Sequence, residues 1–296
     1  MISNGNMISI DAHHHVWDLA VRDQPWLDDE ALTPIRRRFG IDDLEAAAAT
    51  VGGIAGSIVV QTVADIGETE ELLDLAGTAP LVQGVVGYVD VTAPDVGEQL
   101  DRLLASPSGL SLVGIRSLVQ DEPDPDWLAR PMVVAGLREI ARRDLVYDLL
   151  IRSDQLDAAV GTAGTVDGRF VLDHLAKPDI AFGGWEPWAT GLATLANCEN
   201  VTAKLSGLVT EANWTTWSVA DLQPYVDHAL EVFGPGRLLF GTDWPVCLLA
   251  ASYTQVVGAA HELIQRLTLD ERTDILGRTA TATYRLDNFA ARRSGV

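Results

Sequence analysis

Eight short apolar runs, separated by segments with helical character, constrain this chain more than any other feature of its sequence. Runs such as Ile58-Val59-Val60 and Leu238-Leu239-Phe240 are apolar without a break, which is typical of strands buried on both faces of a parallel sheet. The segments between them are long enough for a crossover helix. The predicted strands cover residues 8–13, 57–61, 85–89, 112–116, 145–151, 170–174, 201–205 and 238–243.

Helical signals fill the segments between these runs. Pro131 opens one segment and Arg142-Arg143 close it, as the fixed φ of proline at a first turn and the helix macrodipole both favour. The predicted helices cover residues 42–50, 68–76, 94–105, 131–143, 186–197, 221–233 and 252–267.

Strands that alternate with helices over residues 1–296 indicate the fold class. The pattern predicts an α/β protein with a single-domain (β/α)8 barrel, also called a TIM barrel. A doubly wound open sheet is the alternative, because alternation alone does not prove that the sheet closes. Residues 1–7 precede the first strand and are expected to form a loose N-terminal extension.

The charge balance narrows the classes of partner. The 296 residues include 21 Lys and Arg against 42 Asp and Glu, a net charge of −21. Such a field repels phosphate backbones and anionic lipid, so we expect a small-molecule substrate and neither a nucleic-acid nor a membrane partner. Two cysteines cannot form a disulfide framework, and no apolar stretch is long enough to span a bilayer. These features predict a cytoplasmic protein and are compatible with a homo-oligomer.

Barrel enzymes place their chemistry at the carboxyl ends of the strands, and several polar residues stand there. His13 and His15 end the first run and share one face of an extended strand, with His14 on the opposite face. His174 ends the sixth run and Asp243 ends the eighth. Three imidazoles and a carboxylate indicate a divalent metal site, or a general base, although each residue alone also fits a structural role.

Other strand-end residues are candidates for binding substrate. Arg116 and Lys204 end the fourth and seventh runs, where a cation would hold a carbonyl, carboxylate or ring oxygen. Internal pairing with acidic residues is the alternative for each. Tryptophan faces stack on sugar rings, with core packing as the alternative. The predicted substrate-binding set is Gln61, Arg116, Lys204, Trp17, Trp26 and Trp244.

These segments resemble a known family. Asp11-Ala12-His13-x-His15-Val16-Trp17 resembles the first-strand signature of the amidohydrolase superfamily, and more specifically its amidohydrolase-2 group of predicted metal-dependent hydrolases. Further segments resemble the sugar-lactonase branch of that group, which includes L-fuconolactonases and L-rhamnono-lactonases. They are residues 22–26, 114–116, 120–124, 172–178, 204–212 and 240–247.

The resemblance implies a (β/α)8 barrel that hydrolyses a lactone, with a sugar aldonolactone as the first candidate. It places His13, His15, His174 and Asp243 at a metal-and-base centre, with Asp243, His174 and Arg116 as the catalytic residues. It implies one divalent metal, zinc before others, and also allows metal-independent activity, which occurs in this branch.

Two positions depart from the family pattern, and two other functions stay open. Ser117 stands where relatives often carry His, and His14 stands where Gln is common. The fifth strand offers Asp148 in place of a bridging Lys or His, so a binuclear site is not expected. The alternatives are a metal-dependent decarboxylase of an aromatic or unsaturated carboxylic acid and a non-catalytic barrel that binds a sugar or metal.

Overall fold

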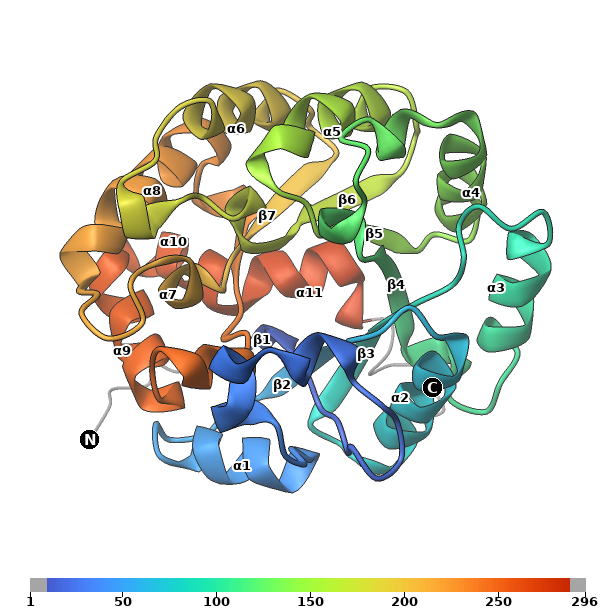
Figure 1. Ribbon diagram of the computed structural model, residues 1–296, viewed down its shortest axis with the longest axis horizontal. Helices are drawn as coiled ribbons and strands as arrows, with labels where there is room; N and C mark the ends of the chain where they lie inside the picture. The colour runs from blue at the N-terminus through green and yellow to red at the C-terminus, as the bar shows by residue number, and fades with distance from the viewer. Residues whose placement is uncertain (1–9, 288–296) are drawn as a thin grey trace.

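The computed structural model describes residues 10–287, and its eight strands form one parallel sheet in the order of the chain (Figure 1). Each strand pairs with the next, from β1 through to β8. All eight predicted strands are confirmed, with ends shifted by a few residues. The bounds are β1 Ile10–His14, β2 Gly56–Val60, β3 Val82–Gly87, β4 Leu112–Ser117, β5 Val146–Leu149, β6 Arg169–Leu172, β7 Val201–Leu205 and β8 Leu238–Phe240.

Helices connect the strands and surround the sheet (Figure 1). The seven predicted helices are confirmed as α1 to α4, α6, α8 and α9. Four further helices, α5, α7, α10 and α11, were not predicted, and the last three have only four to six residues. The bounds are α1 Ile41–Ala49, α2 Ile66–Thr78, α3 Val96–Leu104, α4 Pro131–Arg142, α5 Leu156–Ala163, α6 Trp188–Ala196, α7 Leu208–Glu211, α8 Val219–Phe233, α9 Tyr253–Leu263, α10 Leu269–Thr273 and α11 Thr279–Tyr284. No helix within residues 10–287 combines the length and apolar character that a membrane crossing needs.

Hydrogen bonds between β1 and the segment after β8 bring the two edges of the sheet together. The Asp243 amide donates to the His13 carbonyl at 2.8 Å, and the His15 amide donates to the Trp244 carbonyl at 2.7 Å. His14 and Trp244 pair as an isolated parallel bridge. The sheet therefore curls into a barrel, which confirms the (β/α)8 prediction over an open sheet.

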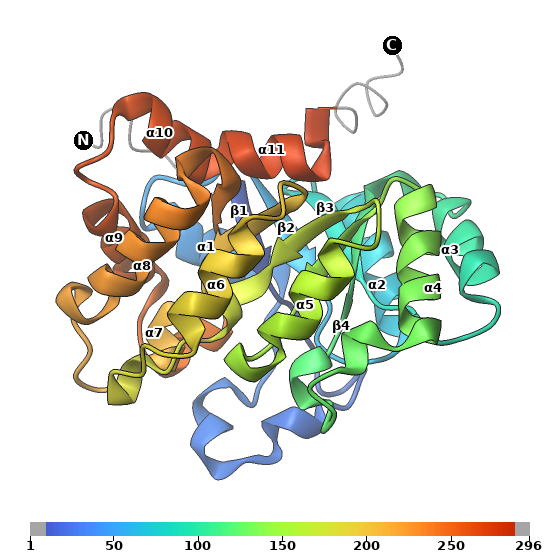
Figure 2. The same cartoon turned by 90° about the horizontal axis from the view of Figure 1, so that it is seen from above.

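The barrel interior is a separate apolar core from the layer between strands and helices. Strand residues that point inward alternate along the chain, as Ile58 and Val60 do on β2. Tyr284 and Leu286, at the end of α11 and beyond it, belong to the same interior cluster. The helix α11 lies across one end of the barrel in both views, so it closes the amino-terminal end of the strands (Figures 1 and 2). The predicted extension over residues 1–7 lies outside the described residues.

The carboxylate of Asp11 ties β1 to the segment after β8. It accepts hydrogen bonds from the Thr242 amide at 2.9 Å and from the Thr242 hydroxyl at 2.6 Å. Both residues are fully buried. We expect Thr242→Val to lower the free energy of unfolding by about 1–3 kcal/mol, because Asp11 loses a donor in a buried setting. Urea unfolding followed by circular dichroism measures this change.

Thr202→Val on β7 is the matched control, because the half-buried Thr202 hydroxyl makes only a long 3.5 Å hydrogen bond to the Phe170 carbonyl. An equal loss of stability in the two variants would contradict the role given to the Thr242 hydroxyl.

Candidate active site

A cavity of about 200 Å³ opens at the carboxyl ends of the strands. The loop after β1 lies at this end, opposite α11 (Figure 2). Five of the predicted site residues line the cavity, and the other lining residues come from the loops after β2, β4, β5, β6 and β8. The lining consists of His15, Trp26, Thr62, Arg116, Leu118, Gln120, Asp121, Leu150, His174, Lys177, Asp243 and Val246.

Three potential ligand atoms converge beside this cavity. The Nε2 atoms of His13 and His15 lie 3.2 Å apart, and the Asp243 Oδ1 atom lies 3.6 Å from the first and 3.4 Å from the second. Ligand atoms of a tetrahedral zinc site lie about 3.3–3.5 Å apart, as bonds of about 2.0–2.2 Å require. His14 points away and its Nε2 atom lies 3.0 Å from the Ser57 hydroxyl, as the strand alternation predicts. The observed triangle therefore fits one divalent ion.

The hydrogen bond of His15 supports this fit. Nδ1 of His15 lies 2.7 Å from the Val60 carbonyl, which can only accept a hydrogen bond, so the Nε2 atom of neutral His15 carries a lone pair. Metal-binding histidines are commonly oriented in this way. Burial, assisted by the nearby Lys204 ammonium, lowers the pKa of His13 well below its ordinary value, so this imidazole is neutral.

His174 is the third imidazole and belongs to an unusual turn. Its ring centroid lies 4.5 Å from that of His13, and its Nδ1 atom lies 2.9 Å from the Ser206 hydroxyl. Burial lowers the pKa of His174 to about 4, against the carboxylate charge of Asp243. His13, His174 and Asp243 place one ligand atom each within 4.8 Å of one another. His174 is therefore a candidate fourth ligand or a neutral partner for water.

Residues 174–177 form a left-handed turn without a glycine. The φ angles of His174, Leu175, Ala176 and Lys177 are 51°, 50°, 58° and 51°. Each such residue costs roughly 1–2 kcal/mol relative to a right-handed conformation. Asp243 also has a positive φ of 57°. Strain that the surrounding structure maintains at several adjacent positions is a feature of functional sites.

The loop after β7 approaches the site so closely that it needs glycine. A Cβ atom at Gly207, where φ is 67°, would lie 2.5 Å from the His174 Nδ1 atom and 3.3 Å from the Asp243 Oδ2 atom. Only glycine fits both this conformation and this distance. Gly207 therefore allows β7 to close one side of the site.

Asp243 is suited to accept a proton only from a strongly polarised donor. Burial would raise its pKa, but the neighbouring imidazoles of His174, His15 and His13 outweigh that effect and hold it below the ordinary value. The carboxylate is therefore ionised at neutral pH. It is 4% exposed, so the charge faces the cavity with little bulk water around it.

Four buried charges lie beneath the imidazoles. The Lys204 ammonium lies 2.5 Å from Asp148 Oδ2, 2.9 Å from Asp173 Oδ1 and 3.1 Å from His13 Nδ1. Arg116 pairs with Asp173 at 3.0 Å. Two cations thus balance two carboxylates in the barrel interior, and internal pairing is what the structure shows for both Arg116 and Lys204.

The pKa values of the two carboxylates shift in opposite directions. Burial raises the pKa of Asp148 even though Lys204 opposes it, whereas Lys204 and His13 outweigh burial and lower the pKa of Asp173. The Tyr284 hydroxyl, at 2.9 Å from both Asp148 oxygens, donates to this carboxylate. The cluster therefore links α11 to the floor of the site.

Two predicted substrate-binding residues, Gln61 and Lys204, do not line the cavity. The side-chain amide of Gln61 donates to the backbone carbonyl of Arg116 at 3.1 Å. The Arg116 guanidinium in turn donates to the backbone carbonyl of Gln61. Lys204 is fully buried within the charge cluster. Arg116 itself does line the cavity.

Of the three predicted tryptophans, one lines the cavity and two do not. Trp26 is half-buried and lines the cavity. Trp17 is buried and its indole donates to the Arg37 carbonyl at 2.7 Å. Trp244 is buried edge-on against Phe39, with ring centroids 5.4 Å apart. Core packing therefore explains Trp17 and Trp244.

Asp173, Lys177 and Gln120 are polar residues of the site that were not among the predicted site residues. Asp173 holds Arg116 and Lys204, and Lys177 and Gln120 line the cavity. Asp173 directly precedes His174 at a strand end, which was a usable signal. No sequence pattern indicated the left-handed turn that brings Lys177 to the cavity.

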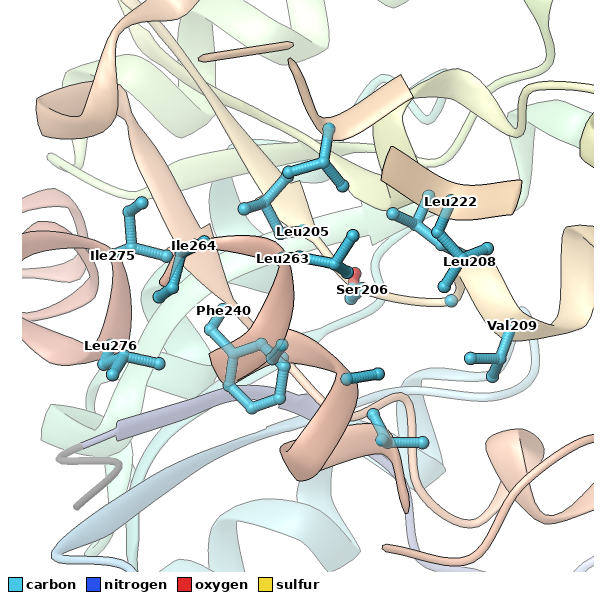
Figure 3. A pocket seen from close by; sticks show the side chains of 16 residues that line it. Leu205, Ser206, Leu208, Val209, Leu222, Phe240, Leu263, Ile264, Ile275 and Leu276 are labelled. Carbon is cyan, nitrogen blue, oxygen red and sulfur yellow. The ribbon is translucent and has the colours of Figure 1, made fainter. Parts of the chain in front are cut away.

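A second pocket lies beside the first, between β7, β8, α8 and α9 (Figure 3). Its labelled side chains are almost entirely carbon, with the Ser206 hydroxyl as the exception (Figure 3). Its volume of about 40 Å³ holds little more than one water molecule. It is too small for a sugar and therefore is not the substrate site.

Comparison with known proteins identifies the family. The profile of the amidohydrolase family matches residues 10–286. The chain belongs to the amidohydrolase family. This result confirms the predicted family and the prediction of a hydrolase.

Several relatives of this amidohydrolase are similar over nearly their whole length. A protein of Burkholderia ambifaria named L-fucono-1,5-lactonase is 36% identical, with 94% of this chain and 96% of the relative covered. The crystal structure of an amidohydrolase from Burkholderia multivorans with bound zinc has a TM-score of 0.88 at 34% identity, and covers 94% of this chain and 99% of that chain. A 2,6-dihydroxybenzoate decarboxylase from Rhizobium, at 14% identity and a TM-score of 0.62, covers 95% of this chain and 99% of its own and shares the fold alone.

The charge cluster generates a stability prediction. We expect Lys204→Met to lower the free energy of unfolding by about 3–5 kcal/mol, because it leaves Asp148 and Asp173 buried with too little positive charge. The double variant Lys204→Met/Asp148→Leu should lose less, because Asp173 keeps Arg116. Chemical denaturation of the three proteins measures both differences.

Arg130→Met serves as the control, because Arg130 pairs with Asp124 on the exposed surface and should change stability little. A double variant less stable than Lys204→Met would contradict the importance of charge balance in this cluster.

Proposed function

We propose that this amidohydrolase opens a sugar lactone, with L-fucono-1,5-lactone as the first candidate. The observation that carries the proposal is the convergence of an ionised Asp243 with the imidazoles of His13, His15 and His174 beside a cavity at the barrel end. The similarity to a relative named L-fucono-1,5-lactonase supports the same substrate class.

The cavity suits a neutral ring with one polar and one apolar side. Trp26, Leu118, Leu150 and Val246 contribute apolar surface, while the remaining lining side chains can hydrogen-bond. A neutral lactone is not repelled by a chain of net charge −21, whereas the aldonate product is repelled once it forms. This chemistry belongs to carbohydrate metabolism, for which we propose a cytoplasmic setting.

The ligand triangle suits one divalent ion, for which zinc is the first candidate. His13, His15 and Asp243 would hold it, with His174 as a further ligand. When bound, the ion supplies positive charge that polarises the lactone carbonyl. The zinc in the related Burkholderia multivorans structure supports this choice.

Asp243 moves the proton in this proposal. Its carboxylate takes a proton from water as the water oxygen attacks the lactone carbonyl carbon. The ring C–O bond then breaks, and Asp243 returns the proton to the departing ring oxygen to give a hydroxy acid. Neutral His174, fixed by Ser206, orients the water at the same face.

Arg116 stabilises the carbonyl oxygen as negative charge develops on it. Its Nη1 atom lies 3.4 Å from His13 Nε2, which places guanidinium charge beside the ligand triangle. The Asp173 carboxylate and the Gln61 carbonyl hold the guanidinium in place, so its orientation is fixed before substrate binds.

The first test replaces the proton acceptor. We expect Asp243→Asn to lower kcat/KM for L-fucono-1,5-lactone by at least about 100-fold, because the amide cannot accept the proton. Acid release followed with a pH indicator measures this loss. Asp124→Asn, on the exposed surface, is the control and should keep wild-type activity. Full activity of Asp243→Asn would refute the mechanism, and release of carbon dioxide from an aromatic acid would favour the decarboxylase alternative.

The second test concerns the metal. We expect the purified enzyme to contain about one zinc ion per chain, and His15→Gln to reduce that content by at least about tenfold, because it removes a ligand atom. Mass spectrometry of the digested protein measures the metal directly. His261→Gln, on α9 away from the cavity, is the control. A metal-depleted enzyme with undiminished kcat would establish metal-independent hydrolysis instead.

A further inference from the structure

The chain contains only two lysines, and both lie at the carboxyl end of the barrel. Lys204 is fully buried in the charge cluster, whereas Lys177 lines the cavity with a side chain that is 29% exposed. All other cationic side chains apart from histidine are arginines. We propose that Lys177 is a specificity residue whose ammonium binds a ring hydroxyl of the sugar lactone, an inference that rests on the proposed function.

The left-handed turn delivers this lysine to the cavity. His174 and Lys177 stand at its two ends, three residues apart, and the Lys177 amide donates to the His174 carbonyl at 2.9 Å. Residues three apart in a helical turn lie on one face, and both side chains do line the cavity. The turn therefore couples the position of Lys177 to that of the imidazole beside the reacting centre.

Contacts outside the cavity impose the shape of this turn. The Trp188 indole donates to the Leu175 carbonyl at 2.6 Å, and the Ser153 hydroxyl donates to the Ala176 carbonyl at 3.2 Å. The side chains of Leu175 and Ala176 are completely buried. Because these contacts hold the middle of the turn, the cavity-facing ends are in place before any substrate arrives.

The ammonium of Lys177 keeps hydrogen-bonding capacity for a ligand. Its ion pair within the described residues is with Glu211, at 3.6 Å, which is longer than a hydrogen bond. An ammonium has three donors, so hydroxyl oxygens of a sugar ring can occupy the others. Gln120, in the loop after β4, also lines the cavity. Its buried Oε1 atom has no hydrogen-bond partner within residues 10–287, so it can accept a hydrogen bond from another hydroxyl of the sugar.

Lys177 is assigned to a ring substituent and not to the reacting carbonyl. Arg116 is the cation beside the ligand triangle, at 3.4 Å from His13 Nε2. The nearest anionic partner of Lys177 is Glu211, from α7, which is not part of that triangle. Substrate hydroxyls, which are absent from a plain lactone, should therefore be what Lys177 recognises.

The test compares two lactones with the same six-membered ring. We expect Lys177→Met to raise KM for L-fucono-1,5-lactone by at least about tenfold, with kcat changed by less than about threefold. The kcat/KM for unsubstituted δ-valerolactone should stay within about twofold of the wild-type value. Lys177→Arg should recover part of the lost affinity, since it restores the charge with a different geometry. Arg152→Met, which removes a surface cation paired with Asp154, is the control and should match the wild type.

Two outcomes would overturn the inference. An unchanged KM for the sugar lactone would show that Lys177 does not bind it, and equal losses on both lactones would assign Lys177 to the carbonyl. If the wild-type enzyme opens neither lactone, the proposed function itself fails, which is a distinct result.

The scarcity of lysine allows a second, independent test. Succinimidyl acetate should acetylate Lys177 and leave buried Lys204 unmodified. Peptide mapping by mass spectrometry distinguishes acetylation of Lys177 from acetylation of the amino terminus, which the reagent also modifies. The stable 1,5-lactam analogue of the sugar lactone should slow acetylation of Lys177 at least about fivefold, while δ-valerolactam should not. Equal rates with and without the sugar lactam would contradict binding at this ammonium.

Discussion

Four buried charges in the barrel interior determine how the rest of the site is arranged. Arg116, Asp148, Asp173 and Lys204 come from β4, β5, the segment after β6 and β7, four consecutive neighbours in the sheet. A shift of any one strand would leave a charge unpaired in a medium of low dielectric constant, at a large cost in free energy. The cluster therefore fixes the strand register as well as the imidazole of His13 above it.

Backbone strain is concentrated above this cluster. Of the seven non-glycine residues with positive φ among residues 10–287, five are Asp243 and residues 174–177. Their positions follow from buried carbonyl acceptors and packed side chains, not from any local preference. Balanced buried charges lie beneath the site, and residues 174–177 are held in an unfavourable conformation beside it. Both features restrict movement of the groups that line the cavity.

Much of this architecture could be predicted from the sequence, because strand periodicity and burial are local properties. The alternation of apolar runs indicated the barrel, and the spacing of His13 and His15 indicated their shared face. The partners of Lys204 could not be predicted, since two of them lie 31 and 56 residues away and meet it only through the closed sheet. The turn at residues 174–177 contains no glycine that would have indicated positive φ.

The hydrogen bond between the Asp243 amide and the His13 carbonyl has a consequence for how the protein matures. The groups that it joins lie in the first and the last strand segments of the barrel. During synthesis on the ribosome, His13 and His15 emerge early, whereas Asp243 emerges only after most of the chain has been made. A nascent or truncated chain that lacks the last strand segment has neither a closed barrel nor the Asp243 carboxylate of the candidate active site.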